Sequence, residues 1–508
     1  MIRAPRLSAL FLPALFVAAL PACGASPSPP PAARPAPEAA SSAEDPPAAA
    51  SLEVGDAVEG VLAGGRFAVP LTVAPGQSYV AVLSSGDGAL GRRHRYRAFT
   101  ASGAEGEARP VTGCVLGAVT PEPPNAEVPS ADRAPAAKRA FAFRHHGEVL
   151  PIEAKPVAVG RHAVVWADVS ADHPAVLDEA FAQAFLEDFE RVILPRARTI
   201  FGVESDIDDD GRIALLFSPL TNQAAVAFFS GCDLSAACPH SNQGEILYLT
   251  PPNAIRPPYN TPRAIKEILA HELEHLLHFN QHVLRHPGLE DDPDGLYLHE
   301  GFGALAQDVT GFQAGNLYVT LAGLKAVDRT SLNPLLTEGR GYDDEDDGPL
   351  RGIAYLFTRW IYDRAGGDAQ GPDGAIVDRG GPTLLRQLLA AKGSVASELL
   401  ARADRERLVA DFYTALAAPK SGATNTCFDF LPTEPDAITQ RQRGADPYAE
   451  FHGQAMTGPS VQPLPGDSEL LAGGADFLLV EPDAEGTTTL FVEVEAEAGA
   501  RLRILRRQ

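Results

Sequence analysis

The sequence predicts an α+β protein: a central domain with a β-sheet, a long helix and a mostly helical subdomain, flanked by small β-rich domains. Short apolar or alternating runs bounded by Gly and Pro occur near both ends of the chain, as they do in strands. Apolar residues at helical spacing dominate the middle. At 508 residues the chain is also too long for one ordinary core, so several domains are expected.

The composition divides the chain into five segments. We expect a signal segment at 1–23, a Pro- and Ala-rich disordered linker at 24–50, a β-rich N-terminal domain at 51–167, a central domain at 168–422 and a β-rich C-terminal domain at 423–508. The linker cannot bury enough apolar surface to fold, so it would act as an extended tether.

The N-terminal segment has the features of an export signal. Arg3 and Arg6 precede a mostly apolar run, Leu7 to Leu20, which is too short for a confident membrane span. The run ends in Leu-Pro-Ala-Cys, which resembles a bacterial lipobox with Cys23 as the acylated residue. That resemblance implies a protein exported to the bacterial cell envelope and held there by lipid. The alternative is an ordinary signal peptide that contains a Cys.

The charge excludes one class of partner. The formal net charge is −24, and no stripe of Lys and Arg occurs. Nucleic-acid binding requires concentrated positive charge, so no nucleic-acid partner is expected. The acidic excess suits a solvated exported surface, or sites for a hard cation such as calcium.

The cysteine count favours disulfides. If Cys23 carries lipid, four of the five cysteines remain, an even number that suggests two disulfides in an oxidising compartment. Cys232 and Cys238 are close enough to close one loop, and Cys114 would then join Cys427. Free buried thiols are the alternative. No CxxC spacing occurs, so a Cys-based zinc site is not expected.

The elements follow in order from these patterns. In the N-terminal domain, strands are expected around Val61, Phe67, Val69, Leu71 and Val73, and around Val80, Val82 and Leu83. Helical spacing begins near His173, where Asp172 and Pro174 suit a helix start, and Pro195 is expected to end it. Strands are expected next at Ile213–Phe217, Ala225–Phe229 and Glu245–Leu249.

A long helix is expected from Thr261, as cap, with Pro262 in the first turn, toward His286. Further elements are helices at Leu298–Asp308, Gly352–Arg364, Pro382–Ala391 and Ala396–Ala417, and terminal strands at Phe477–Val480 and Leu490–Val494.

The strongest motif lies inside the long helix, at His-Glu-Leu-Glu-His. His271 and His275 are four residues apart, so their side chains share one helix face and can reach one zinc ion. Glu272 lies beside the first His, where it could take a proton from water and pass it to a leaving amine. Such a motif also arises by chance on amphipathic helices.

Glu300 is the candidate third ligand, 25 residues after His275 and on a second expected helix. A metzincin site requires Gly and His where this chain has His278 and Gln281, so that arrangement fails. We expect surface or supporting roles for His278 and His282, since four His ligands would close the position that a catalytic zinc keeps open.

These segments resemble a known family. Leu269–Gln281 resembles the active helix of hyicolysin-type bacterial metallopeptidases, and Glu300-Gly301 resembles their second helix, with His299 in place of the usual Asn. Similar stretches include Asp206–Ile213, Ser241–Ile246 and Gly352–Phe357, so the resemblance covers roughly 175–415. It implies a gluzincin-like metallopeptidase fold, one zinc ion and endopeptidase activity on protein or peptide substrates.

Weaker site predictions accompany this one. Tyr355 is the candidate donor to the oxyanion, with a packed core tyrosine as the alternative. Its rivals are a histidine or Tyr297, Tyr318, Tyr342 and Tyr362. Asp308 and Gln307 could orient a ligand histidine, although a solvated helix face is the simpler interpretation.

The acidic loops give one candidate calcium site. Asp206, Asp208 and Asp210 precede Gly211 as in a calcium loop, but Phe217 stands where the closing acidic residue belongs. The alternative is an Asp-Gly turn. We interpret the runs Glu290–Asp294 and Asp343–Asp347 as solvated loops, with ion sites as the alternative; the first run borders the long helix and could shape substrate entry.

Two functions from different classes stay open. One is a zinc endopeptidase with Glu272 as general base. The other is a non-catalytic, lipid-anchored envelope or surface binding protein with a relic metal site. A fortuitous motif on a helical binding domain is a third reading. The oligomeric state is not predicted.

Overall fold

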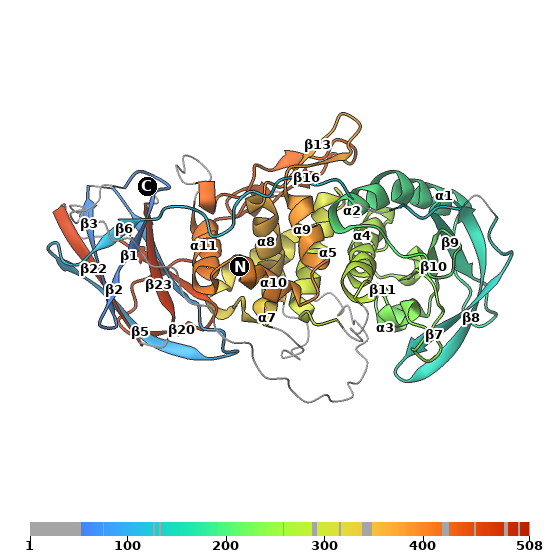
Figure 1. Cartoon of the computed structure of the whole chain (residues 1–508), viewed down its shortest axis with the longest axis horizontal. Helices are drawn as coiled ribbons and strands as arrows, with labels where there is room; N and C mark the ends of the chain where they lie inside the picture. The colour runs from blue at the N-terminus through green and yellow to red at the C-terminus, as the bar shows by residue number, and fades with distance from the viewer. Residues whose placement is uncertain are drawn as a thin grey trace, which may run out of the picture.

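The computed structural model describes residues 52–74, 76–124, 127–131, 134–257, 259–286, 292–313, 316–337, 348–418, 426–451, 454–481, 486–495 and 498–506. The predicted signal segment, Cys23 and the linker lie outside these residues, as do Tyr342 and Asp343–Asp347. Figure 1 shows an elongated molecule with a β-sandwich at one end, helices in the middle and a second sheet at the other end.

The sandwich is built from both ends of the chain. One sheet has the order β19-β21-β4-β23-β1-β6 and the other β2-β3-β22-β5-β20. The strands are β1 Ala57–Gly60, β2 Leu62–Ala63, β3 Arg66–Val73, β4 Tyr79–Ser85, β5 Arg93–Ser102, β6 Ala108–Pro110, β19 Gln462–Pro463, β20 Ser468–Leu471, β21 Ala475–Val480, β22 Gly486–Val494 and β23 Ala500–Arg506. Alternating residues such as Val69, Leu71 and Leu490 fill the space between the sheets.

This topology differs from the expected separate domains at 51–167 and 423–508. β22 pairs with β3 and β5, and β23 pairs with β1 and β4, so both sheets are built from strands of the two regions. Alternation along a strand shows which face is buried, but not which strand lies beside it.

The remaining strands of the 51–167 region belong to a second six-stranded sheet. Its order is β11-β12-β10-β9-β8-β7. The strands are β7 Arg139–His145, β8 Glu148–Val159, β9 Ala163–Asp168, β10 Ile213–Phe217, β11 Ala227–Phe229 and β12 Ile246–Leu249. β10 runs parallel to β9 and β12, whereas β11 is antiparallel to β12 and is the last strand of the sheet.

Helix α1, Glu179–Asp188, covers this sheet and starts later than predicted. Asp178 caps it by accepting from the Phe181 amide. Helix α1 continues through a π-helical turn, Phe189–Ile193, into helix α2, Leu194–Phe201. The helical segment therefore does not end at Pro195, contrary to the prediction. Pro195 is the second residue of α2, which directly follows the π-helical turn.

The central helices are α3 Thr221–Ala224, α4 Pro262–Phe279, α5 Leu296–Val309, α6 Asn316–Lys325, α7 Asn333–Leu336, α8 Gly348–Arg364, α9 Gly381–Leu389, α10 Val395–Arg402 and α11 Arg405–Ala417. Small ribbons pair β13 Asp368–Gln370 with β14 Ile376–Asp378, β15 Glu434–Pro435 with β16 Gln442–Arg443, and β17 Glu450–Phe451 with β18 Gln454–Ala455. The helix predicted at Ala396–Ala417 is two helices, because Asp404 caps α11 by accepting from the Arg407 amide.

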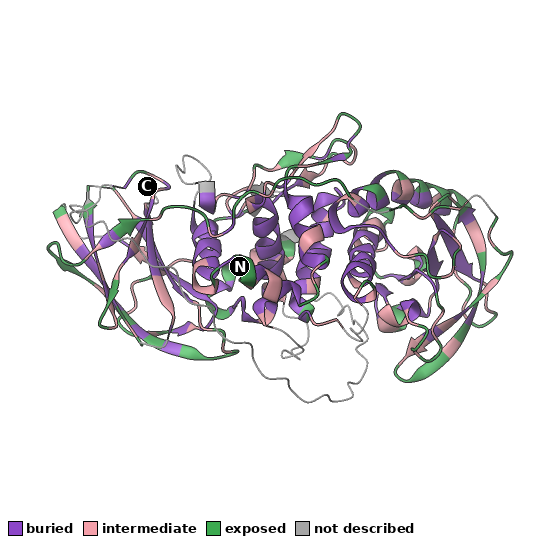
Figure 2. Ribbon diagram, viewed as in Figure 1, coloured by how far each residue is buried: buried purple, intermediate pink, exposed green. Residues whose placement is uncertain are grey.

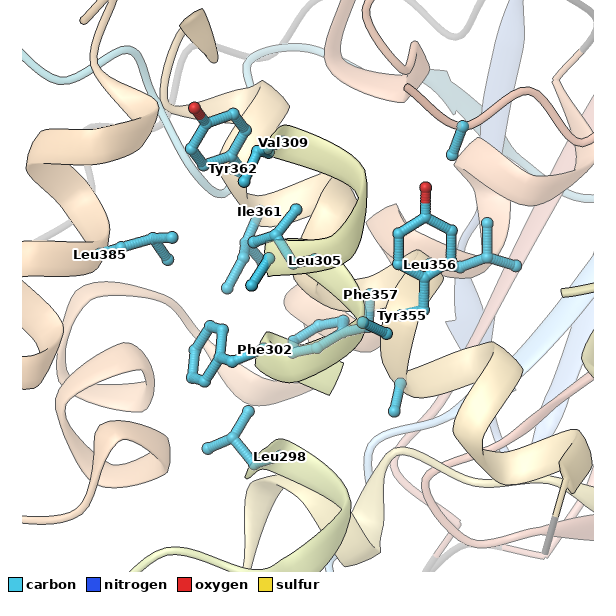
Figure 3. Close-up of a cluster of buried hydrophobic side chains, with 14 of the residues drawn as sticks. Leu298, Phe302, Leu305, Val309, Tyr355, Leu356, Phe357, Ile361, Tyr362 and Leu385 are labelled. Carbon is cyan, nitrogen blue, oxygen red and sulfur yellow. The ribbon is translucent and has the colours of Figure 1, made fainter. Parts of the chain in front are cut away.

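The helices bury a continuous core, which Figure 2 shows in purple through the middle of the molecule. α5 and α8 lie in close contact, with Phe302, Leu305 and Ile361 among their buried side chains (Figure 3). Gly301 permits this approach: a Cβ there would lie 2.9 Å from the Ala354 carbonyl oxygen. Helix α8 is therefore held against the part of α5 that carries Glu300.

Two disulfides are present, as the cysteine count predicts. Cys114 is bonded to Cys427, and Cys232 to Cys238. Within the described ranges, every helix is too short or too polar to cross a membrane.

Candidate metal centre

Helix α4 presents the two histidines of the motif on one buried face. Its start is set by Thr261, whose hydroxyl accepts from the Ala264 amide at 3.2 Å, and by Pro262 in the first turn. The rings of His271 and His275 are 4.7 Å apart between centroids and nearly perpendicular, at 88°. Both side chains are buried.

Glu300 on α5 completes the group. Its Oε2 lies 3.4 Å from His271 Nε2, and one ligand atom from each of His271, His275 and Glu300 lies within 4.8 Å of the others. The Nε2 atoms of both histidines and Oε1 of Glu300 are buried and have no hydrogen-bond partner among the described residues. Three unpartnered ligand-type atoms of two His and one Glu fit a zinc ion and would leave it an open position.

A glycine brings α5 close to the first histidine. A Cβ on Gly303 would lie 2.5 Å from Cε1 of His271 and 2.6 Å from both ring nitrogens. Real Cβ atoms do not approach ring atoms so closely, so the absence of a side chain here allows the ring and the helix to pack together.

Arg351 on α8 sets the charge of Glu300. Its Nη1 donates to Glu300 Oε2 at 2.8 Å. Burial by itself raises the pKa of Glu300, but Arg351 and His271 outweigh it and lower that pKa to about 2. Glu300 is therefore ionised, as a metal-binding carboxylate must be. Burial lowers the pKa of His275, which favours the neutral imidazole that a metal requires.

Glu272 is held between the helix and the sheet. Its Oε2 accepts from the Phe229 amide of β11 at 3.1 Å, and its Oε1 is buried without a hydrogen-bond partner among the described residues. Burial raises the pKa of Glu272 to about 8. A carboxyl group whose pKa lies near neutrality is suited to take and return a proton.

Glu274 is a site residue that sequence reasoning missed. Its Oε2 accepts from His275 Nδ1 at 3.0 Å, which orients the ring so that Nε2 faces His271 and Glu300. The hydrogen bonds from His275 and His278 outweigh burial and lower the pKa of Glu274 to about 2. The i,i+4 spacing of Glu274 and His278 was the available signal, because it predicts a contact on the helix.

The structure does not bring Tyr355 to this group. Its hydroxyl donates to Asp308 Oδ2 at 2.9 Å, and Asp308 lies two turns along α5 from Glu300, about 12 Å by helical rise. Asp308 is fully buried and not on a solvated face. Its carboxylate also accepts hydrogen bonds from Arg359 and from the Gly444 amide. Of the rival tyrosines, Tyr297 and Tyr362 are buried and Tyr318 is exposed.

The acidic loop before β10 does gather its carboxylates. Ligand-type atoms of Asp206, Asp208 and Asp210 lie within 4.8 Å of one another. However, Arg139 Nη1 lies 3.2 Å from Asp208 and 3.6 Å from Asp210, so a guanidinium already neutralises part of the charge. A calcium ion at this loop stays a prediction.

Other polar residues near α4 differ from expectation. His278 and His282 are fully buried, so of the two roles expected for them the surface role is excluded, and His278 contacts Glu274, the partner of His275. Asp294, predicted in a solvated loop, is also buried, and Asp292 is partly buried. The reason is that the segment before α5 folds back against the end of α4, a long-range contact that charge patterning does not reveal.

No protein-family model matches the sequence. A region of 153 residues, 28% of this chain, is 28% identical to the neutral metalloprotease ShpI of Staphylococcus hyicus and covers 33% of that protein. The chain thus spans about a third of the length of the curated relative that it matches. This distant, partial similarity supports a relationship to metallopeptidases.

Proposed function

We propose that the protein is a zinc-dependent endopeptidase that hydrolyses peptide bonds in protein or peptide substrates. The observation that carries the proposal is that buried His271, His275 and Glu300 bring one ligand-type atom each within 4.8 Å of one another, beside the buried carboxyl group of Glu272. The Nε2 atoms of both histidines have no hydrogen-bond partner among the described residues. The distant similarity to a neutral metalloprotease supports the same reaction class.

The side chains have distinct roles in this proposal. His271, His275 and Glu300 would hold the zinc ion, which when bound polarises a carbonyl group and lowers the pKa of water. Arg351 keeps Glu300 ionised, and Glu274 keeps the His275 ring in the orientation that points Nε2 inward. Tyr355, bonded to Asp308, has no part in this mechanism.

Glu272 acts as the general base. Its Oε2 is anchored by the Phe229 amide, so the carboxylate plane is fixed while Oε1 stays available. Oε1 takes the proton of the attacking water and returns it to the nitrogen of the leaving amine. A pKa raised by burial makes the carboxylate a stronger base than an exposed glutamate.

The strand β11 would align the substrate. It is the last strand of its sheet in the described structure, and its Phe229 amide already contacts Glu272. An extended peptide can add to such an edge through main-chain hydrogen bonds. We infer that a substrate chain runs along β11 past the proposed zinc position.

We further propose that the enzyme is exported and anchored to the bacterial envelope through lipid on Cys23, with 24–50 as a tether. The alternative function is a non-catalytic envelope binding protein with a relic metal site. The buried Glu272 favours the enzyme, because a structural site requires no general base.

Casein cleavage by the full-length protein in detergent tests the proposal, with zinc content measured on every sample. Glu272→Gln retains an oxygen that can accept from the Phe229 amide, so it is expected to fold and bind zinc but lose cleavage. Glu398→Gln on α10, which loses only an ion pair with Arg402, is the matched control and should cleave normally. Zinc-loaded wild-type protein with no more activity than Glu272→Gln would favour the binding protein.

A further inference from the structure

A second group of buried, metal-ligating side chains lies one helical turn beyond His275. His278 and His282 come from the end of α4 and the π-helical turn Asn280–Leu284 that continues it. Asp292 and Asp294 come from the segment that leads into α5. The side chains of His278, His282 and Asp294 are 0% exposed. None of the four takes part in the proposed peptidase mechanism.

Neighbouring atoms in this group are separated by distances typical of ligands to one ion. Asp294 Oδ2 lies 3.4 Å from His278 Nε2 and 3.5 Å from His282 Nε2, and Asp292 Oδ2 lies 3.6 Å from His278 Nε2. Nitrogen and oxygen ligands at about 2.0–2.2 Å from a tetrahedral zinc ion are separated from one another by about 3.3–3.5 Å. These three separations are close to those between neighbouring ligands of one ion, and His282, Asp292 and Asp294 bring one ligand-type atom each within 4.8 Å of one another.

These same atoms lack hydrogen bonds. Nε2 of His278, Nε2 of His282 and Oδ2 of Asp294 are all buried and without a hydrogen-bond partner among the described residues. Leaving three such polar atoms unsatisfied in a protein interior is costly. An ion bound between them would satisfy all three at once.

The opposite edges of these groups are held in place. His278 Nδ1 contacts Glu274 Oε1 at 3.3 Å, and His282 Nδ1 contacts the Leu389 carbonyl oxygen at 3.0 Å. Asp294 Oδ1 accepts from the Val395 amide at 2.8 Å. Metal-binding histidines characteristically donate their second ring N–H to a carboxylate or carbonyl in this way.

We propose that His278, His282, Asp292 and Asp294 form a second metal site, which binds a divalent transition-metal ion, zinc above all, with four protein ligands. Two imidazoles and two carboxylates suit zinc better than calcium or magnesium, which prefer oxygen ligands. Four protein ligands leave no open position, so this ion has a structural role. It joins the end of α4 to the segment entering α5.

The second site also supports the first. Glu274 bonds to His278 through one oxygen and to His275 through the other. Asp292 Oδ1 lies 3.5 Å from Nε2 of His299, the residue before Glu300. The second ion would therefore fix the neighbours of two of the three ligands of the first site.

Metal stoichiometry tests this inference. The full-length protein is equilibrated with zinc, passed through a desalting column and analysed for zinc per chain by mass spectrometry. Asp294→Asn removes a ligand charge but keeps an oxygen for the Val395 amide. His271→Ala removes a ligand of the first site only, and Asp476→Asn, at a buried acid in the sandwich, is the control.

We expect two zinc ions in the wild type and in Asp476→Asn, and one each in Asp294→Asn and His271→Ala. One zinc in the wild type and none in His271→Ala would overturn the second site. One zinc in the wild type, one in His271→Ala and none in Asp294→Asn would sustain it while removing the basis of the proposed peptidase. If Asp294→Asn does not fold, the other two samples still decide. Two zinc ions in the wild type and one in His271→Ala support the second site, whereas one in the wild type and none in His271→Ala refute it.

Discussion

Replacing Gly303 with Ala should disturb the proposed zinc site without unfolding the protein. The added Cβ would lie 2.5 Å from Cε1 of His271, whereas carbon atoms in contact are about 3.5–4.0 Å apart. The His271 ring or the whole of α5 must therefore retreat by roughly 1 Å. Metal ligands tolerate only about 0.2 Å of displacement.

The stability change is small, since two effects oppose each other. Overpacking a tight interior costs about 1–3 kcal/mol, while replacing Gly with Ala inside a helix returns about 1 kcal/mol. The expected net loss is about 0–2 kcal/mol. Disturbing the residues that orient a metal ligand typically lowers the metal affinity by about 10–100-fold, so the zinc affinity of Gly303→Ala should fall much more than its stability.

Competition with a chromophoric zinc chelator measures this affinity, and urea unfolding measures the stability of the same samples. Gly348→Ala at the start of α8 is the control, because the added Cβ there meets no described atom within 4 Å. Unchanged zinc affinity in Gly303→Ala, with the protein folded, would refute either the packing of α5 against His271 or the role of that residue as a ligand.

Three further predictions follow from other contacts. Arg351→Met removes the cation that lowers the pKa of Glu300, so burial would raise that pKa and protons would compete with zinc for the carboxylate at a higher pH. The variant should therefore release zinc at a higher pH than the wild type when zinc content is followed between about pH 4 and pH 7. Coincident release curves would contradict this. Burial raises the pKa of Asp476 from 3.8 to about 6, so the folded state binds this proton more tightly than the unfolded state does. Protonation of Asp476 therefore stabilises the folded state below about pH 4, and this contribution to the free energy of unfolding is lost as the pH rises through 6. The loss should be up to about 3 kcal/mol by urea unfolding, and Asp476→Asn should abolish it; an equal pH slope in the variant would refute the assignment. Replacing Cys114 and Cys427 with Ser opens a link between residues 313 apart and should cost about 2–5 kcal/mol, more than replacing Cys232 and Cys238, which are 6 apart; equal losses in urea would contradict the loop-entropy reasoning.

The sequence by itself determined the local features of this protein. The i,i+4 spacing of His271 and His275, the cap at Thr261 and the apolar periodicity of α4 depend only on neighbouring residues, so they could be predicted without the fold. Glu300 could be predicted because its residue type and its distance along the chain match a second helix that folds back. The α+β class and the pairing of the cysteines followed from composition and spacing in the same way.

Tertiary structure alone decided which distant segments meet. The strands near both ends look alike in sequence, yet they are mixed within two shared sheets, because the whole fold decides which strands pair and alternation of apolar residues does not. Tyr355 lies on a predicted helix, but the packing of α8 on α5 turns its hydroxyl toward Asp308. The sequence left a surface or a supporting role open for His278 and His282 and predicted Asp294 in a solvated loop. The packing of the segment before α5 on the end of α4 buries all three against one another. Such contacts join residues whose separation in sequence carries no local signal, so only the folded chain reveals them.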